Sequence, residues 1–255
     1  MFCVLKVTER KQSFYEKIFG RFIKDEYSLS TIPVFKGAPF YLLEITTGKR
    51  GVDWEKVLVL VGKCASRLVT DCKIELPSEM NIGKFESDRL YNKVMKNTFL
   101  NILENNVNKK TPLSVSVLDS KGEFADFVES VSDYSLSLTI ATNEKEKYYY
   151  TCEKIKNNTG LCPVLTTDFA DGDIKINMDK NIMTIRRKDE IINISSGLDL
   201  KAPEIYEKLL PENISACNFY SALYELCGVF ALGECVFETI TVNNEKKHIH
   251  DIHFS

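Results

Sequence analysis

Polar side chains that could bind a ligand follow three consecutive apolar runs in the middle of the chain. Each run has the length of a buried strand and ends in hydroxyl, amide or carboxylate residues. If the runs form parallel strands, these residues meet beyond the carboxyl ends of the sheet, where open parallel sheets bind ligands. The same residue types also cap helices and form turns, so a purely structural role is the alternative. The ligand-binding candidates are Asp119, Ser120, Lys121, Gly122, Thr142, Asn143, Thr167 and Asp168.

The three histidines of the chain are His248, His250 and His253, close to its C-terminus. On a strand, His248 and His250 would share one face, and two imidazoles at that spacing can bind a transition metal. His253 would lie on the opposite face, so a third ligand would have to come from elsewhere. An exposed edge strand with alternating polar residues is the alternative.

Two further segments carry charges that could bind ions. Asp168, Asp171 and Asp173 surround a glycine and offer oxygen ligands of the kind that Mg²⁺ and Ca²⁺ prefer, although their spacing is not that of an EF-hand loop. Residues 47–51 combine two glycines with two cations ahead of a predicted helix, as some anion sites do, without the spacing of a P-loop. A solvated turn is the alternative in both cases.

The candidate residues depend on elements that bring the three apolar runs together. Strands are predicted at 113–119, 136–141 and 163–167, and they alternate with helices predicted at 123–131 and 144–157. Such alternation predicts parallel strands joined by right-handed crossovers.

Over residues 112–180 this alternation resembles the Rossmann-type fold of nucleotide-binding proteins. In that family the first strand–helix turn carries Gly-x-Gly-x-x-Gly, which lets the backbone approach a pyrophosphate. Here the turn from Asp119 to Glu123 has one glycine, Gly122, and two carboxylates. Thr142 and Asn143 stand where the family places an acidic residue for the ribose. We therefore expect no cofactor, and no binding of NAD or NADP in the usual mode.

Residues 57–61 allow two interpretations. They could form a buried strand that enters a turn at Gly62, or they could belong to a helix. Apolar residues at helical spacing from Trp54 onward, with Asp53 as a good N-cap, favour a helix at 53–69.

Outside these segments, hydrophobic patterns and turn residues predict the other elements. The strands are expected at 2–7, 27–32, 40–45, 72–76, 174–178, 182–186, 191–195, 235–242 and 247–254, and the helices at 14–23 (or part of a β-rich cap), 87–105, 203–210 and 214–227. Because residues 106–111 form a polar connector, we predict an α/β protein with an N-terminal α/β module (1–106), followed by a Rossmann-like parallel βαβ unit with a C-terminal α+β extension (107–255).

Composition limits the partners that we expect. A formal net charge of −3 and the lack of a long basic run argue against nucleic acid. No apolar run approaches the ~20 residues of a membrane span. Eight cysteines without Cys-x-x-Cys spacing, and no recognisable signal peptide, predict reduced thiols and a cytoplasmic location.

The leading hypothesis is a cytosolic, non-enzymatic or degenerate Rossmann-like module that binds a small ligand or a protein partner. The alternative is an enzyme that acts on a nucleotide or a phosphorylated metabolite at the strand ends, with Asp119 and Lys121 in the leading roles.

Overall fold

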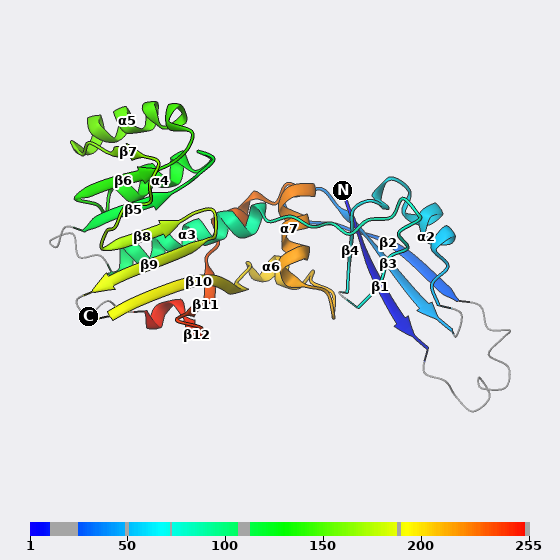
Figure 1. Cartoon of the computed structure of the whole chain (residues 1–255). Helices are drawn as coiled ribbons and strands as arrows, with labels where there is room; N and C mark the ends of the chain where they lie inside the picture. Colours follow the sequence, from blue (N-terminus) through cyan, green and yellow to red (C-terminus); the bar gives the residue numbers. More distant parts are fainter. Residues whose placement is uncertain (11–24, 49–50, 72, 107–112, 188–189, 253–255) are drawn as a thin grey trace. The chain divides into compact units, whose positions relative to one another are not determined.

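The computed structural model describes residues 1–10, 25–48, 51–71, 73–106, 113–187 and 190–252 (Figure 1). The chain folds as two compact units, and each is assembled from segments that are far apart in the sequence. The first unit consists of Met1–Tyr91 and Ala202–Glu234, and the second of Asn92–Lys201 and Cys235–Ser255. Each unit holds one mixed β-sheet, so the chain is a mixed α/β protein. A domain boundary at residues 106 and 107 stays a prediction.

The first unit is built on a four-stranded sheet with the order β2-β3-β1-β4. β1 is parallel to β3 and β4, whereas β2 is antiparallel to β3. β3 and β4 are parallel to each other because both pair in parallel with β1, which lies between them, and helix α2 connects the two. The strands are β1 (Cys3–Glu9), β2 (Glu26–Ile32), β3 (Phe40–Thr47) and β4 (Leu68–Thr70), and the helices are α2 (Trp54–Val61), η1 (Gly62–Cys64), α6 (Glu204–Glu207), α7 (Ala216–Leu226) and η3 (Phe230–Glu234).

The interpretation of residues 57–61 as helix is confirmed, but the helix is shorter than predicted. Asp53 caps α2 by accepting a hydrogen bond from the Lys56 backbone N–H at 3.1 Å. Gly62, at φ 52°, ends the helix because most residues with a side chain avoid this conformation. Val57 and Val61 face β1 and β3 in the hydrophobic core, and Trp54 packs at its margin.

Several other predictions for the first unit need correction. The strand expected at 72–76 is wrong for the described residues 73–76, since the chain pairs with β1 earlier, at Leu68–Thr70. The helix expected at 203–210 is the single turn Glu204–Glu207. The predicted helix at 14–23 lies outside the described residues, as do Lys49 and Arg50 of the candidate anion site.

The second unit contains an eight-stranded sheet with the order β12-β11-β10-β9-β8-β5-β6-β7. β8, β5, β6 and β7 are parallel, and the strands from β8 to β12 pair in antiparallel fashion. The strands are β5 (Ser114–Leu118), β6 (Ser137–Ala141), β7 (Val164–Thr166), β8 (Ile174–Asn177), β9 (Ile182–Arg187), β10 (Glu190–Leu200), β11 (Phe237–Val242) and β12 (Glu245–His248). The helices are α3 (Arg89–Asn106, which begins in the first unit), α4 (Ala125–Ser132), η2 (Lys145–Tyr148), α5 (Tyr149–Thr159) and η4 (Ile249–Asp251).

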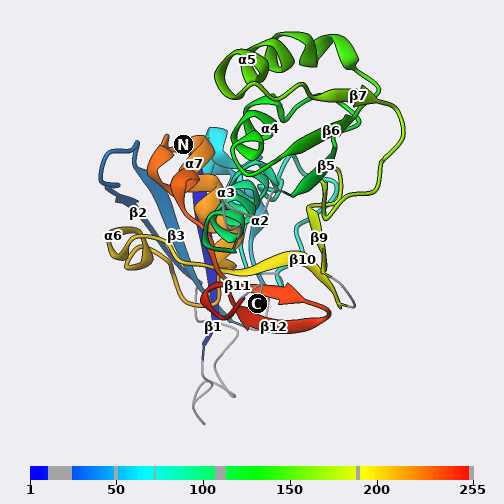
Figure 2. The same ribbon diagram turned by 90° about the vertical axis from the view of Figure 1, so that its left-hand side faces the viewer.

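The two faces of this sheet differ in chemistry. Val117, Ile140 and Ile176 pair with one another across neighbouring strands, so they share one face, and all three are fully buried. Helices α3, α4 and α5 lie on one side of the sheet (Figure 2). Residues of the opposite face are polar, as the pairing of Ser116 with Thr139 and Lys175 shows. The connection from β7 to β8 crosses this polar face without a helix. There the Phe169 ring contacts the Lys175 ammonium and Asp171 pairs with Lys175 and Arg186.

These features correct the predicted fold in part. The three central strands are parallel, as predicted, but parallel pairing covers only part of the sheet. Within the described ranges, α3, α4 and α5 lie on one face of it, and the β7–β8 connection on the other has no helix (Figure 2). A doubly wound sheet has helices on both faces. A Rossmann-like unit is therefore not confirmed as the fold of this segment.

The C-terminal strands also differ from the prediction. The hairpin turn at Asn243 and Asn244 is confirmed, with both residues at positive φ. The following strand ends at His248 instead of continuing, and η4 (Ile249–Asp251) follows it directly. The end of the strand expected up to residue 254 lies outside the described residues. None of the helices in the described ranges has the length and apolar character needed to cross a membrane.

Candidate functional site

Asp119 is the centre of the candidate site. It follows β5 directly, and its side chain is completely buried. One carboxylate oxygen, Oδ2, accepts hydrogen bonds from the Tyr148 hydroxyl at 2.5 Å and from the Phe124 backbone N–H at 2.8 Å. The other, Oδ1, is buried and has no hydrogen-bond partner among the described residues. Asp119 therefore ties β5 to the start of α4 and to η2, and leaves one acceptor unused.

Gly122 allows the chain to turn between β5 and α4. Its φ is 63°, and a Cβ added there would lie 2.9 Å from Cδ of Lys147. Lys147 in turn donates a hydrogen bond from Nζ to the Lys121 carbonyl oxygen at 2.7 Å. The turn is thus packed closely, and its single glycine is needed for its conformation.

The neighbouring strand β8 contributes a second carboxylate. The register pairs Leu118 with Asn177, so Ser120 lies beside Asp179. Asp179 accepts hydrogen bonds from the Ser120 backbone N–H at 3.2 Å and from its hydroxyl at 2.5 Å. Ser120, a predicted candidate, therefore binds a carboxylate of its own chain.

Helix α3 brings a cation and an amide to the same end of the sheet. The Lys96 ammonium lies 3.9 Å from the centroid of the Phe124 ring. Burial lowers the pKa of Lys96, an effect that Lys93 adds to and nearby carboxylates, first among them Asp119, oppose. One turn earlier on α3, Asn92 accepts a hydrogen bond from the Asn181 amide at 2.9 Å, while Oδ1 of Asn181 is buried without a partner among the described residues.

Tyr148 acts as a hydrogen-bond donor in this arrangement. Burial raises its pKa, and the hydrogen bond to Asp119 raises it further. The phenol therefore stays protonated at neutral pH and cannot serve as a base. We call Asp119, Ser120, Tyr148, Asp179, Lys96 and Asn181 the strand-end site.

The other predicted candidates take structural roles or lie further along the sheet. Thr142 is buried, and its hydroxyl accepts a hydrogen bond from the Glu144 backbone N–H at 3.1 Å. The Asn143 backbone N–H donates to the Ser120 carbonyl oxygen at 3.3 Å. Thr167 and Asp168 follow β7, which is two strands away from β5, and both are exposed. The structure thus brings Asp119 and Ser120 together with residues that sequence reasoning missed.

One missed residue carried a recognisable signal. Asp179 follows the strand predicted at 174–178, so the rule that selected Asp119 would have selected it too. Tyr148, Lys96 and Asn181 come from two helices and a turn, and no local pattern indicates that they approach β5.

Two of the three aspartates around Gly172, Asp171 and Asp173, form side-chain contacts within the protein. Asp171 pairs with Lys175 at 3.1 Å, which lowers the pKa of Asp171. Asp173 accepts hydrogen bonds from the backbone N–H and the hydroxyl of Ser114, both at 2.7 Å, and its pKa is also lowered. Over the ranges that the structure describes, no group of three or more His, Cys, Asp or Glu residues could hold a metal ion.

The histidines do not have the arrangement that the sequence suggested. His248 is the last residue of β12 and His250 lies in η4, so the two do not share a strand face. Both are exposed, and His253 lies outside the described residues. Metal binding by His248 and His250 stays a prediction.

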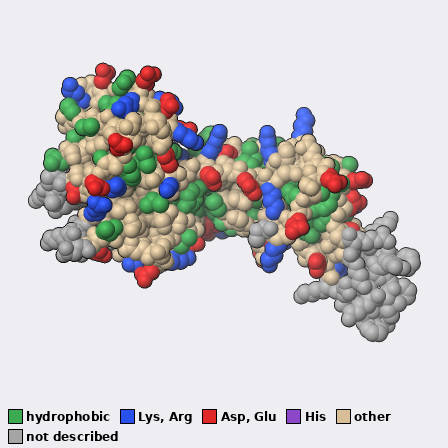
Figure 3. Space-filling view, in the orientation of Figure 1, with side chains coloured by type: hydrophobic (Ala, Val, Ile, Leu, Met, Phe, Trp, Pro, Cys, Tyr) green, Lys and Arg blue, Asp and Glu red, His purple; other side chains and the backbone are tan. Residues whose placement is uncertain are grey.

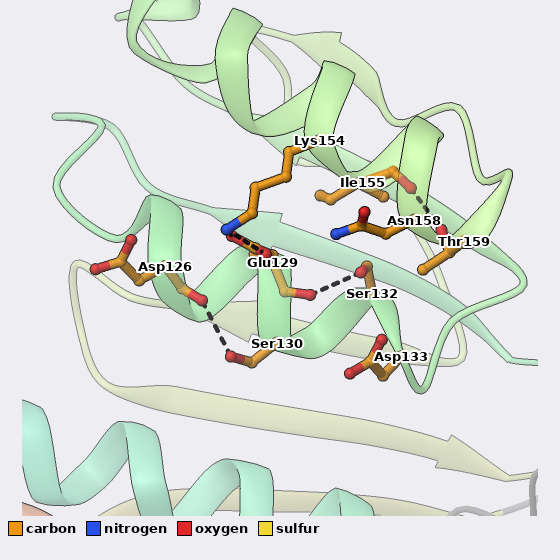
Figure 4. Close-up of a pocket in the computed structure, with 9 residues that line it drawn as sticks. All are labelled: Asp126, Glu129, Ser130, Ser132, Asp133, Lys154, Ile155, Asn158 and Thr159. Atoms are coloured by element: carbon orange, nitrogen blue, oxygen red, sulfur yellow. Dashed lines mark hydrogen bonds and ion pairs between the residues drawn. The ribbon is translucent and has the colours of Figure 1, made fainter.

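A polar groove of about 440 Å³ lies between α4 and α5 (Figure 4). Lys154 reaches from α5 to Glu129 on α4, at 2.7 Å. The groove contains three carboxylates and a single cation, and no feature of the sequence predicted it. The residues that line it are Asp126, Glu129, Ser130, Ser132, Asp133, Lys154, Ile155, Asn158 and Thr159.

No protein-family model, curated protein or solved structure matches this chain.

Proposed function

We propose that the second unit is a Rossmann-like module that binds a small ligand at the carboxyl ends of β5 and β8. The order of its parallel strands supports this proposal. From β5 the chain proceeds through β6 to β7 on one side and then returns to place β8 on the other side. Where successive connections leave in opposite directions, loops separate at the strand ends, and ligands of open α/β sheets bind there.

The contacts of the site favour binding over catalysis. Oδ2 of Asp119 is occupied by two donors, Tyr148 remains protonated, and Ser120 is held by Asp179. The two described histidines lie at the β12 edge of the sheet, five strands from β5. The alternative, an enzyme acting on a nucleotide or a phosphorylated metabolite, would need one of these groups to exchange partners.

Dinucleotides should not bind in the usual mode. A pyrophosphate needs close approach of the backbone, and the turn at Gly122 is filled by the Lys147 side chain. Asp119 and Glu123 add like charges close to the phosphates, where repulsion is stronger than in bulk water. Calorimetric titration with NAD and NADP, oxidised and reduced, should show no Kd below about 1 mM. A micromolar Kd that Gly122→Val abolishes in a folded protein would contradict this expectation.

Chemical-shift mapping of backbone amides tests the location of binding. We expect D-ribose, adenosine, AMP or inorganic phosphate to shift amides of residues 120–124 and 178–181. Ser120→Ala should weaken the shifts, while Ser130→Ala, a matched change in the α4–α5 groove, should leave them unchanged. A folded protein without shifts for any probe would refute the proposal, and turnover of AMP would establish the enzymatic alternative.

A further inference from the structure

Two buried acceptor oxygens lack partners at the same end of the sheet. Oδ1 of Asp119 follows β5, and Oδ1 of Asn181 lies in the turn after β8, the adjacent parallel strand. Neither oxygen has a hydrogen-bond partner among the described residues. A buried polar atom without a partner is unfavourable, so two such atoms at the same end of the sheet indicate that hydrogen-bond donors are missing there.

Residues of α3 interact with both Asp119 and Asn181. Asn181 donates to Asn92, and Lys96 lies one turn further along the same face of the helix. The Lys96 ammonium is close enough to Asp119 for their charges to interact, yet it lies over the Phe124 ring. Each acceptor residue thus interacts with α3, Asp119 through the charge of Lys96 and Asn181 through its hydrogen bond to Asn92.

The charges around Lys96 disfavour an anionic ligand. Three carboxylates, Asp119, Glu123 and Asp126, and one further cation, Lys93, interact with its ammonium group. Asp179 adds another carboxylate beside Ser120. A phosphate dianion would add two negative charges where carboxylates already outnumber the ammonium groups, whereas hydroxyl groups donate hydrogen bonds without adding charge.

From these contacts we infer that the strand-end site takes a neutral polyhydroxylated ligand, a free sugar or a nucleoside, whose hydroxyls donate to Oδ1 of Asp119 and Oδ1 of Asn181. This inference rests on the proposed function and specifies its ligand. Both oxygens are shielded from solvent, so the ligand enters by displacing the long side chain of Lys96, which is only partly buried. The face of the half-buried Phe124 ring that the Lys96 ammonium covers is then available to a sugar or base.

Asp119→Asn tests the inference at a single atom. With the amide oxygen in the place of Oδ2, the variant keeps the contacts to Tyr148 and Phe124 and presents an NH₂ donor where Oδ1 stood. Asp126→Asn removes the same charge from the neighbourhood of Lys96 and leaves both acceptors intact. Adenosine, D-ribose and AMP are titrated into the whole chain and both variants, with amide chemical shifts as the readout.

We expect adenosine to bind the wild type at least tenfold more tightly than AMP. Asp119→Asn should weaken adenosine binding at least tenfold. Asp126→Asn should retain adenosine binding and reduce the ratio of the affinities for adenosine and AMP. AMP binding more tightly than adenosine at the same residues would overturn this inference and leave the proposed function standing. No binding of any probe to the folded chain would overturn both, and would assign the two oxygens to fixed water.

Discussion

A single buried carboxylate organises the residues around β5. Asp119 uses one oxygen to hold Tyr148 and the first residue before α4, and the other oxygen has no partner among the described residues. The first role accounts for the local fold, because two donors offset the cost of burying a charge. The second oxygen makes no hydrogen bond among the described residues, and the proposed ligand preference depends on it.

Asp53 provides a test of the local structure at one residue. Its carboxylate accepts the Lys56 N–H, so Asp53→Ala should lower the free energy of unfolding by about 0.5–2 kcal/mol. Glu55→Ala, in the first turn of the same helix, removes a charge but no capping bond and should cost less. Urea unfolding of the three proteins measures the difference. Equal stability of Asp53→Ala and wild type would contradict the capping role.

Residue-level predictions succeeded where the signal was local. Asp53 precedes a run with helical spacing, and the cap that this pattern predicts is present. Asp119 was selected because it ends an apolar run, and it does follow a strand. Lys96 and Tyr148 escaped prediction because their roles depend on contacts across more than twenty residues of sequence.

At the scale of the elements, side-chain hydrogen bonds join β5 and β8 at both ends of the strands. Asp179 binds Ser120 at the carboxyl ends, and Asp173 binds Ser114 at the amino ends. These side-chain contacts supplement a short pairing of four residues in β8. The connection that precedes β8 has no helix among the described residues. The Ser120–Asp179 and Ser114–Asp173 hydrogen bonds, here called the two clamps, therefore help to hold β8 next to β5.

The Asp173 clamp predicts a dependence of stability on pH. Hydrogen bonds from Ser114 lower the pKa of Asp173 in the folded chain. The contribution is therefore complete above the unfolded pKa of about 3.9 and is lost as the pH falls through the lower folded value. Asp173→Asn should cost about 1 kcal/mol at pH 7, and the difference from wild type should shrink below about pH 4.

Unfolding free energies measured from pH 7 to pH 2.5 check this expectation, with the exposed Asp168→Asn as the control. A difference between wild type and Asp173→Asn that stays constant down to pH 2.5 would contradict an ionised clamp.

The order of elements was predictable, but the pairing beyond the central strands was not. Alternation of strands with helices indicated the parallel group correctly. The sequence 114–118 also alternates serine with apolar residues, which is typical of a sheet buried on one face only. Helix α2 ended earlier than predicted because apolar spacing continues past Gly62, while the backbone there leaves the helical conformation.

At the scale of the whole molecule, sequence proximity does not define the compact units. Residues 202–234 fold with the N-terminal segment, and α7 packs Phe219 against Phe2 and Phe40. No hydrophobic pattern in the sequence indicates that residues 202–234 fold with the N-terminal segment. On the face shown in Figure 3, acidic and basic side chains are interspersed without a broad patch of one sign.

The cysteines should all be reduced. The seven described cysteines form no disulfides, and burial raises the pKa of Cys3 to about 12 and that of Cys227 to about 11. Such thiols contain little thiolate at neutral pH and react slowly with oxidants. Alkylation of the freshly purified chain under denaturing conditions without reductant should modify eight thiols by intact mass. Stable protection of two or more would contradict the predicted reduced state and, with it, the predicted cytoplasmic location.

The central claim, a site for a neutral sugar or nucleoside at the carboxyl ends of β5 and β8, is tested most directly by a crystal structure of the chain grown with adenosine. We predict electron density for the nucleoside beside Phe124, with ribose hydroxyls within hydrogen-bond distance of Oδ1 of Asp119 and Oδ1 of Asn181. Density for ordered water alone at these two oxygens, with adenosine absent or bound in the α4–α5 groove, would contradict it.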